Sequence, residues 1–417
     1  MITNRVVVTG LGAVTPIGNH IEEYWTALQQ GVSGAAPITK MDASRYKTRF
    51  ACEVKGFEPS EYLDMKETKS LDLYTQYAVA AASQAVERAG LNGKISDPYR
   101  AGVIFASGVG GLLTLQEEVV QYTKNDFRPR FSPHLITKMI SNIAAGIIGI
   151  RFDFRGPNYG TVSACASSSH AISDAFNLIR LRKADLFIVG GAEASINPVG
   201  LGGFSCMRAI SENNDNPQVA SRPFDKDRDG FVLGEGAGAL ILESLEHAQA
   251  RNAPILAELI GCGMTADAFH ATLPHPEGRS VYQAMAMALE DGSISADQVD
   301  YVNLHGTSTP AGDPPELSAV QRIFQNSLEK LHVSATKSMT GHLLGAAGAI
   351  EAVATVLSIR DGVIPPTINT CNLDPKIEVK VDLTLGKAVK KDVKVALSNN
   401  FGFGGQNASL LFKKFEG

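Results

Sequence analysis

The chain has 417 residues, 44% hydrophobic and 19% charged, which is enough for one large α/β unit or two to three ordinary domains. Its formal net charge of −5 argues against nucleic-acid binding, which requires a basic surface. Five scattered cysteines without a C-x-x-C pair indicate a reduced, cytoplasmic protein without a disulfide framework or zinc site, and the absence of a long apolar run predicts no membrane insertion.

Strand and helix patterns alternate along the chain, as is typical of an α/β fold. The sequence predicts a first strand at Arg5–Thr9, with no signal-peptide pattern before it, and a helix over Leu71–Ala89 that Gly90 ends. Further strands are predicted at Ala101–Ala106, Asp185–Val189, Ala239–Leu242, Leu256–Ile260, Val299–Leu304, Val333–Ala335 and Val393–Leu397.

The order of these elements indicates a duplication. The strand "VVVTGLGAVT", the later strand "AGVIFASGVGG" and the turn at Cys165 correspond to "LAELIGCGMT", "DYVNLHGTST" and "HVSATKSMTGH" in the second half. We therefore expect two similar halves, residues 1–253 and 254–417. No Pro/Gly/Ser linker separates them, so they should pack as one body.

Two motifs suggest ligands that the rest of the sequence does not support. "DKDRDGFVLGEG" begins like a calcium loop, but Gly236 stands where the loop needs its Glu and no helix pair flanks it, so a solvated or salt-bridged turn is the better interpretation. "GLGAVT" after the first strand lacks the third Gly of a dinucleotide loop.

Cys165 lies in "TVSACASSSHAISDAF", where an extended segment passes into a helical pattern. A helix N-terminus presents unpaired N–H groups that lower the pKa of a thiol and favour its nucleophilic thiolate. A small buried cysteine in a tight turn is the structural alternative for this stretch alone.

Other chemically useful side chains also follow predicted strands. His305 follows the strand in "VNLHGTSTPAGD", Lys337 and His342 lie in "SATKSMTGHLLGAAG", and Phe401 and Phe403 lie between glycines in "SNNFGFGG". Each alone would be a core, surface or packing residue. Because open α/β sheets place their sites at the carboxyl ends of strands, the set together predicts acyl transfer through a thioester. Two imidazole N–H groups would stabilise an enolate oxygen.

Several of these segments resemble the β-ketoacyl-acyl-carrier-protein synthases, specifically the elongating type II enzymes of bacterial fatty-acid synthesis. The resemblance covers nearly the whole chain and includes "SRPFDKDRDGFVLGEGAG", "HGTSTPAGD", "TKSMTGHLLGAAGAIE" and "NNFGFGG". It implies a thiolase-like α/β fold, with two duplicated halves in a layered α-β-α-β-α core. It also implies a decarboxylating Claisen condensation that needs no cofactor and no catalytic metal.

The resemblance assigns a role to each matched residue. It implies that Cys165 carries the acyl chain, that His305 and His342 bind the malonyl thioester, and that Lys337 organises the pocket. The remaining assignments are these: Glu351 and Asp313 support the pocket; the N–H groups of Cys165 and Phe401 form the oxyanion hole; Phe401 and Phe403 form the gate; Thr307 and Thr309 contact the pantetheine arm; Asn303, Glu351, Ser398 and Asn399 match a structural cation cluster.

The implied partners are acyl- and malonyl-loaded acyl carrier protein and a second copy of the chain, toward whose pocket Phe131–Asn142 would reach. Because the carrier is an acidic helical bundle, we expect a local basic patch on this chain to meet it. The candidates for this patch are Lys66, Lys69, Arg128, Arg130 and Arg208.

Three alternatives bear on this interpretation, and the first of them stays open. A polyketide or aryl-polyene ketosynthase would share the catalytic residues, and the sequence cannot fix the preferred acyl length. A degradative thiolase would need a second cysteine, which the "FGFGG" region lacks. A non-catalytic partner subunit would lack the thiol that Cys165 supplies.

Overall fold

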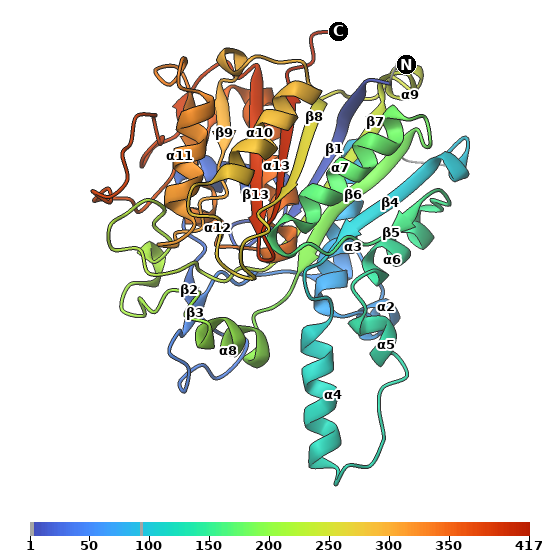
Figure 1. Cartoon of the computed structure of the whole chain (residues 1–417). Coiled ribbons are helices and arrows are strands. Elements are labelled where there is room, and N and C mark those ends of the chain that lie inside the picture. The colour runs from blue at the N-terminus through green and yellow to red at the C-terminus, as the bar shows by residue number, and fades with distance from the viewer. Residues whose placement is uncertain (1–3, 92–94) are drawn as a thin grey trace.

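A computed structural model describes residues 4–91 and 95–417 of the chain. Its largest feature is a ten-stranded sheet with the order β10-β9-β13-β14-β8-β1-β7-β6-β4-β5 (Figure 1). The strands of this sheet are β1 (Val6–Val14), β4 (Ala101–Ala106), β5 (Asn158–Tyr159), β6 (Leu186–Glu193), β7 (Gly236–Ser244), β8 (Ala257–Ala266), β9 (Tyr301–Asn303), β10 (His332–Ser334), β13 (Val395–Gly402) and β14 (Gln406–Lys413).

Short two-stranded sheets and helices complete the chain. The short strands are β2 (Ala36–Pro37) with β3 (Phe50–Ala51), and β11 (Val363–Ile364) with β12 (Val389–Lys390). The α-helices are α1 (Ile21–Gln30), α2 (Met65–Ser70), α3 (Leu73–Arg88), α4 (Leu112–Lys124), α5 (Leu135–Met139), α6 (Ile143–Phe152), α7 (Ser167–Arg180), α8 (Pro198–Cys206), α9 (Leu245–Ala250), α10 (Arg279–Asp291), α11 (Asp313–Ile323), α12 (Lys337–Thr340) and α13 (Ala347–Asp361). The 3₁₀ turns are η1 (Pro59–Glu61), η2 (Pro98–Arg100), η3 (Ala164–Ala166), η4 (Pro217–Val219), η5 (Ala296–Gln298) and η6 (Leu344–Ala346).

The sheet repeats one topology twice, which confirms the expected duplication of the fold. In one half β1 and β6 pair antiparallel with β7, while β6, β4 and β5 run parallel. In the other half β8 and β13 pair antiparallel with β14, while β13, β9 and β10 run parallel. A short antiparallel pairing of β1 with β8 joins the halves into a continuous sheet.

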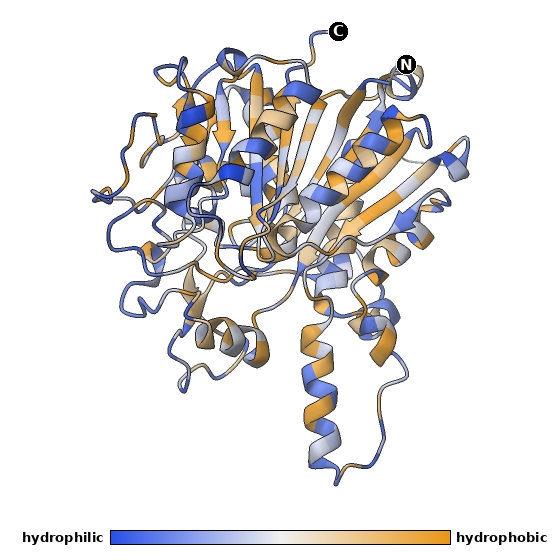
Figure 2. Ribbon diagram, viewed as in Figure 1, coloured by the Kyte–Doolittle hydropathy of each residue, from blue (hydrophilic) through white to orange (hydrophobic). Residues whose placement is uncertain are grey.

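Helices complete five layers. The helix α3 packs on β1, β7 and β6, whereas α10 packs on β8 and β14. Between the two half-sheets lie α7 and α13, and α13 contacts both β7 and β13. Figure 2 shows hydrophobic residues along the strands and on the faces of the helices that cover them. The helices α7 and α13 are therefore covered by a half-sheet on each side. Residues at the N-terminal ends of these two helices lie between the two halves of the chain.

The predicted elements agree with the structure to within a few residues, except where a strand continues past the predicted end. The helix predicted over Leu71–Ala89 is α3, which begins at Leu73 because the Asp72 side chain accepts a hydrogen bond from the Tyr74 N–H at 3.2 Å and caps the helix. The first strand continues past Thr9 to Val14 through an irregularity after Val8. Among the described residues, no helix is both long and apolar enough to cross a membrane.

The close packing of α3 on β1 gives a test of this fold. An Ala Cβ at Gly12 would lie 1.9 Å from the Ala81 carbonyl oxygen, so Gly12→Ala should lower the free energy of unfolding by about 3 kcal/mol in urea denaturation. The control is Gly203→Ala in α8, where the new Cβ meets no atom within 4 Å and stability should hold or rise slightly. Equal denaturation midpoints for the two variants would contradict the packing.

Candidate active site

Cys165 lies in the turn η3, directly before α7 begins. The preceding residue, Ala164, has φ of 49°, a left-handed conformation that turns the chain sharply and that non-glycine residues rarely adopt. Burial raises the pKa of the Cys165 thiol to about 11, although Lys337 and the backbone N–H groups of Phe403 and Cys165 favour the thiolate. The expected lowering by the helix N-terminus is therefore outweighed by the loss of water around the sulfur.

The two imidazoles predicted to meet at the thiol do so. His342 Nε2 lies 2.9 Å from Cys165 Sγ, and the rings of His305 and His342 are 5.4 Å apart, nearly perpendicular. Burial, followed by the charge of Lys337, lowers the pKa of both histidines well below the usual value. Both rings are therefore neutral at pH 7.

The hydrogen bonds of His342 fix which ring nitrogen carries its proton. The Leu344 N–H donates to His342 Nδ1 at 3.3 Å, so Nδ1 is the acceptor. A neutral ring then carries its hydrogen on Nε2, facing the sulfur. This orientation makes His342 an N–H donor toward whatever is bound beside Cys165.

This tautomer also decides whether the site suits a metal ion. One ligand atom each from Cys165, His305 and His342 lie within 4.8 Å of one another, a set that zinc could use. A zinc ligand needs a free lone pair on Nε2, however, and the Leu344 N–H favours a proton there. The residues do not fit a catalytic metal.

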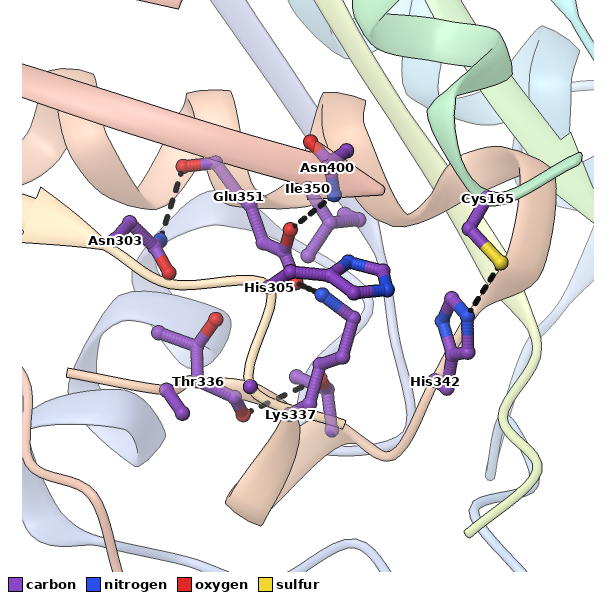
Figure 3. A network of polar contacts seen from close by, with 12 residues as sticks. Cys165, Asn303, His305, Thr336, Lys337, His342, Ile350, Glu351 and Asn400 are labelled. Carbon is purple, nitrogen blue, oxygen red and sulfur yellow. Dashed lines mark hydrogen bonds and ion pairs between the residues drawn. The ribbon is translucent and has the colours of Figure 1, made fainter. Parts of the chain in front are cut away.

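Lys337 pairs with Glu351 next to the His305 ring, whereas His342 lies to one side, beside Cys165 (Figure 3). Glu351 Oε2 also accepts a hydrogen bond from Asn400 Nδ2 at 2.6 Å, and Asn400 Oδ1 accepts one from Ser169 Oγ at 2.6 Å. All four side chains are buried. The network thus joins α12, α13, β13 and α7, and it satisfies both charges away from water.

His305 is held by a second carboxylate. The Glu316 side chain accepts the His305 N–H and the Gly306 N–H, both at 2.7 Å. Burial raises the pKa of Glu316 to about 8, although these two hydrogen bonds act to lower it. Sequence reasoning missed Glu316, although an acid in the first turn after "GDPP" was an available signal; Asn400 is distinguishable in the sequence as an Asn close to the site where Ser is common in the family.

Asp313, expected to support the pocket, is fully buried. Its carboxylate accepts the Phe224 N–H at 2.9 Å and lies 3.4 Å from the Arg228 guanidinium, which also pairs with Asp374 at 2.8 Å. Asp313 therefore anchors the turn that follows His305 from behind. The "DKDRDG" motif supplies Arg228; of the solvated or salt-bridged turn expected from the sequence, the structure shows the salt-bridged one.

A cavity of about 450 Å³ opens onto the thiol, and its lining is largely apolar. The predicted site residues that line it are Cys165, His305, Thr307, Thr309, His342, Phe401, Phe403 and Arg208. The Thr307 and Thr309 hydroxyls are 3.0 Å apart. Lys337 and Glu351 lie behind this wall.

The Gly-rich segment contributes differently from the expectation. The Phe401 ring lies 5.7 Å from the His305 ring, at the position expected of a gate. The backbone N–H that favours the Cys165 thiolate is that of Phe403, however, and not that of Phe401. Phe401 is instead in register with Asn407 inside the β13–β14 hairpin. The second backbone donor beside the sulfur is therefore Phe403.

The residues matched to a structural cation cluster lie behind the ion pair. Asn303 and Ser398 are neighbours in register on β9 and β13, and Asn303 Oδ1 and Ser398 Oγ are buried without a hydrogen-bond partner among the described residues. Asn303 Nδ2 donates to the Glu351 carbonyl at 3.4 Å, and Asn399 Oδ1 accepts a hydrogen bond from the Ser409 hydroxyl at 2.8 Å. Asn303 and Ser398 thus each offer one free oxygen of the kind that a hard cation prefers, whereas Asn399, the Glu351 carbonyl and the Glu351 carboxylate already accept hydrogen bonds.

The basic docking candidates are not gathered in one place. Arg208 lines the cavity, Lys66 and Lys69 lie exposed on α2, and Arg128 and Arg130 lie in the exposed loop between α4 and α5. In one copy of the chain, Arg208 is the candidate that borders the cavity.

Comparisons with known proteins agree with this geometry. The β-ketoacyl synthase N-terminal domain matches residues 3–248 and the C-terminal domain matches residues 256–371. The 3-oxoacyl-[acyl-carrier-protein] synthase 2 of Synechocystis is 49% identical over 99% of this chain and 98% of its own length. The enzyme of the same name from Coxiella burnetii is 45% identical over 99% of both.

Solved structures give the same result. A β-ketoacyl synthase from Burkholderia phymatum is 35% identical with a TM-score of 0.92, over 99% of this chain and 100% of its own. AntDE, a type II polyketide ketosynthase bound to its acyl-carrier protein AntF, is 31% identical with a TM-score of 0.92 over the same shares. The chain therefore belongs to the β-ketoacyl synthase family.

Proposed function

We propose that this chain elongates fatty acids by condensing an acyl group, held on Cys165, with malonyl-[acyl carrier protein]. The products are 3-oxoacyl-[acyl carrier protein], CO₂ and free carrier protein. The observation that supports this most directly is the meeting of one thiol and two neutral imidazoles, from different halves of the chain, in one apolar cavity. The curated relatives at 44–49% identity favour fatty-acid synthesis over a polyketide pathway.

The first half-reaction is acyl transfer to Cys165. The sulfur attacks the thioester carbonyl of the acyl carrier, its C–S bond to the carrier breaks, and the thiol proton ends on the departing carrier thiol. The backbone N–H groups of Cys165 and Phe403 stabilise the negative oxygen that forms in between. We propose that Phe401 opens and closes this acyl side of the cavity.

The second half-reaction is decarboxylation followed by condensation. As the C–C bond to the malonyl carboxylate breaks, CO₂ leaves and the electron pair forms an enolate, whose oxygen accepts N–H bonds from His305 and His342. The enolate carbon attacks the acyl carbonyl and displaces the Cys165 thiolate, which takes up a proton from solvent. Because both rings are neutral, they stabilise the enolate without protonating its carbon.

The other residues act as supports in this scheme. Burial, together with the charge of Lys337, keeps the imidazoles neutral, and Glu351 pairs with that lysine. Thr307 and Thr309 bind the pantetheine arm at the cavity wall. Asp313 holds the turn that follows His305, through its ion pair with Arg228. A structural cation bound by Asn303 and Ser398 would stabilise the ends of β9 and β13 and would take no part in the chemistry. The five free cysteines support a cytoplasmic location, where thiols stay reduced.

The role of Cys165 gives the decisive test of this function. Cys165→Ala should abolish formation of 3-oxoacyl product from acyl- and malonyl-carrier protein, measured by mass spectrometry, because the acyl chain has no sulfur to occupy. Cys262→Ala is the control, since Cys262 lies outside the cavity lining and should leave the rate unchanged. Condensation by a folded Cys165→Ala variant would refute the mechanism.

Assays of the natural chain with acyl-carrier proteins of increasing acyl length would define its substrate range.

Ketosynthases of this kind act with an acyl carrier protein, and we propose that the acidic carrier docks on Arg208 at the cavity. Lys66, Lys69, Arg128 and Arg130, which lie elsewhere on one copy of the chain, are proposed as more distant contacts of the same carrier. Arg208 is exposed and borders the cavity through which the pantetheine arm must pass. Complementary charge at such a rim steers association and is screened by salt.

Charge reversal tests this docking surface. Arg208→Glu should raise the KM for acyl-carrier protein about fivefold at low salt, with kcat unchanged, because the substitution affects encounter and not chemistry. The control Lys394→Glu lies exposed before β13, at the end opposite Phe401, and should leave KM as it is. If the two variants have the same KM, Arg208 is not part of the docking surface.

We also propose that the protein is a homodimer. The strand β5 ends the sheet with an exposed edge, and such an edge is a template for pairing with another strand. Exposed apolar side chains lie beside it and on the projecting α4–α5 region that Figures 1 and 2 show: Ile150 (79% exposed), Val162 (60%), Phe131 (45%) and Ile136 (61%). A second copy, paired β5 to β5, would cover both surfaces.

Sedimentation measures this association. The natural chain should sediment at micromolar concentration with about twice the chain mass of 44.3 kDa. Val162→Asp should shift the population toward the monomer, because a carboxylate would then be buried at the interface. A monomeric natural chain at this concentration would exclude the proposed dimer.

A further inference from the structure

Glu193, the last residue of β6, is a fully buried carboxylate that the chemistry above does not use. Its Oε2 accepts the Gly108 N–H at 2.8 Å and the Gly345 N–H at 3.0 Å. Its Oε1 accepts the Ser107 hydroxyl at 3.1 Å and the Val109 N–H at 3.3 Å. In the described part of the chain no Lys, Arg or His forms an ion pair with it, so its partners are backbone and hydroxyl donors.

These donors belong to two segments that meet at the active-site cavity. Val109, after β4, and Leu344, in η6, both line that cavity. A Cβ on Gly345 would lie 2.3 Å from the Gly108 backbone nitrogen and 2.8 Å from Glu193 Oε2. The segments therefore touch through their backbones, and the carboxylate binds both of them at the point of contact.

The Gly345 bond acts next to a strained residue that contacts His342. Leu344 has φ of 49°, a left-handed conformation that costs about 1 kcal/mol or more for a branched side chain and persists only where neighbours hold it. Its N–H is the group that donates to His342 Nδ1. Because Glu193 holds the next amide, it orients the Leu344 peptide and, through it, the His342 ring.

We propose that Glu193 is a positioning residue for His342: by holding Gly345, it keeps the Leu344 N–H on Nδ1 and so keeps the Nε2–H of His342 facing Cys165. This inference rests on the proposed function, in which His342 donates that N–H to the enolate. It assigns Glu193 an effect on decarboxylation and condensation without any contact with substrate.

Two substitutions separate position from charge. In Glu193→Gln the amide oxygen can keep the Gly108 and Gly345 donors while its NH₂ turns to the Ser107 hydroxyl, so only the 3.3 Å contact from Val109 is lost. Glu193→Asp keeps the carboxyl group but is one methylene shorter, which withdraws the acceptor about 1.5 Å from Gly345. The Gln variant should therefore work better than the Asp variant.

The measurements are malonyl decarboxylation, condensation, and the tautomer of His342 in ¹⁵N spectra of the purified full chain labelled in its histidine rings. We expect kcat within about threefold of the natural chain for Glu193→Gln and at least about tenfold lower for Glu193→Asp, because a wrong tautomer removes the donor. The spectrum should show protonated Nε2 in the first variant and a tautomer mixture in the second.

Glu243→Gln is the matched control for loss of a buried carboxylate. Glu243 is also fully buried and lies on β7, near the opposite end of its pairing with β6, where it binds Thr9, His247 and Arg251. The substitution Glu243→Gln should lower the thermal unfolding midpoint and leave both kcat and the His342 tautomer unchanged.

The outcomes distinguish this inference from the proposed function. Equal tautomers and equal kcat in the Asp variant and the natural chain would overturn the inference, and so would a loss at Glu193→Gln of tenfold or more with its fold intact. If Glu193→Asp does not fold, Glu193→Gln alone tests the inference: a tenfold or greater loss of kcat, or loss of the Nε2 proton in its ¹⁵N spectrum, would overturn it. Failure of the natural chain to condense would instead refute the proposed function.

Discussion

The exclusion of water around one sulfur and two imidazoles is the constraint on which the rest of this structure depends. It sets the pKa of His305 and His342 well below the usual value and raises that of Cys165. A charged lysine in such surroundings would be unstable alone, and its pairing with Glu351 resolves this. Breaking a buried pair of this kind typically costs about 3–5 kcal/mol, so Lys337 and Glu351 depend on each other.

The duplicated topology explains how the dry site is assembled. Each half brings a central helix, α7 or α13, to the middle layer, and the N-terminal ends of these helices lie close together between the sheets. The first half supplies the sulfur, whereas the second supplies both histidines, the ion pair and the Gly-rich hairpin. The hydrogen bond of Ser169 to Asn400 then joins α7 to β13 across this junction.

The sequence was sufficient for the strands, the repeat and the segments that meet at the cavity, because hydrophobic periodicity and glycine-rich turns are local signals. Cys165, His305 and His342 were recognisable because each follows a strand or opens a helix. The contact of Glu193 with Gly345 across 152 positions depends on side-chain reach in the folded chain and left no local signal. Glu316 follows "GDPP" in the sequence, but its hydrogen bond to the His305 amide is likewise visible only in the folded chain.

Two expectations, the lowered pKa of Cys165 and the backbone donor to the oxyanion, differ from the structure, each for one physical reason. A helix N-terminus was expected to lower the pKa of Cys165, but a local dipole is weaker than full burial of the thiol. Phe401 was expected to donate to the oxyanion, but its place in the β13–β14 ladder leaves Phe403, beyond the strand end, beside the sulfur.

The high pKa of Cys165 also bears on how long the enzyme survives in a cell. Peroxides and other electrophiles react with thiolates, so a thiol that ionises only near pH 11 is oxidised slowly to sulfenic acid. Its reactivity appears when a thioester carbonyl reaches the backbone donors and the proton has a departing thiol to accept it. The nucleophile is thus protected from oxidative damage by the same burial that requires its substrate to activate it.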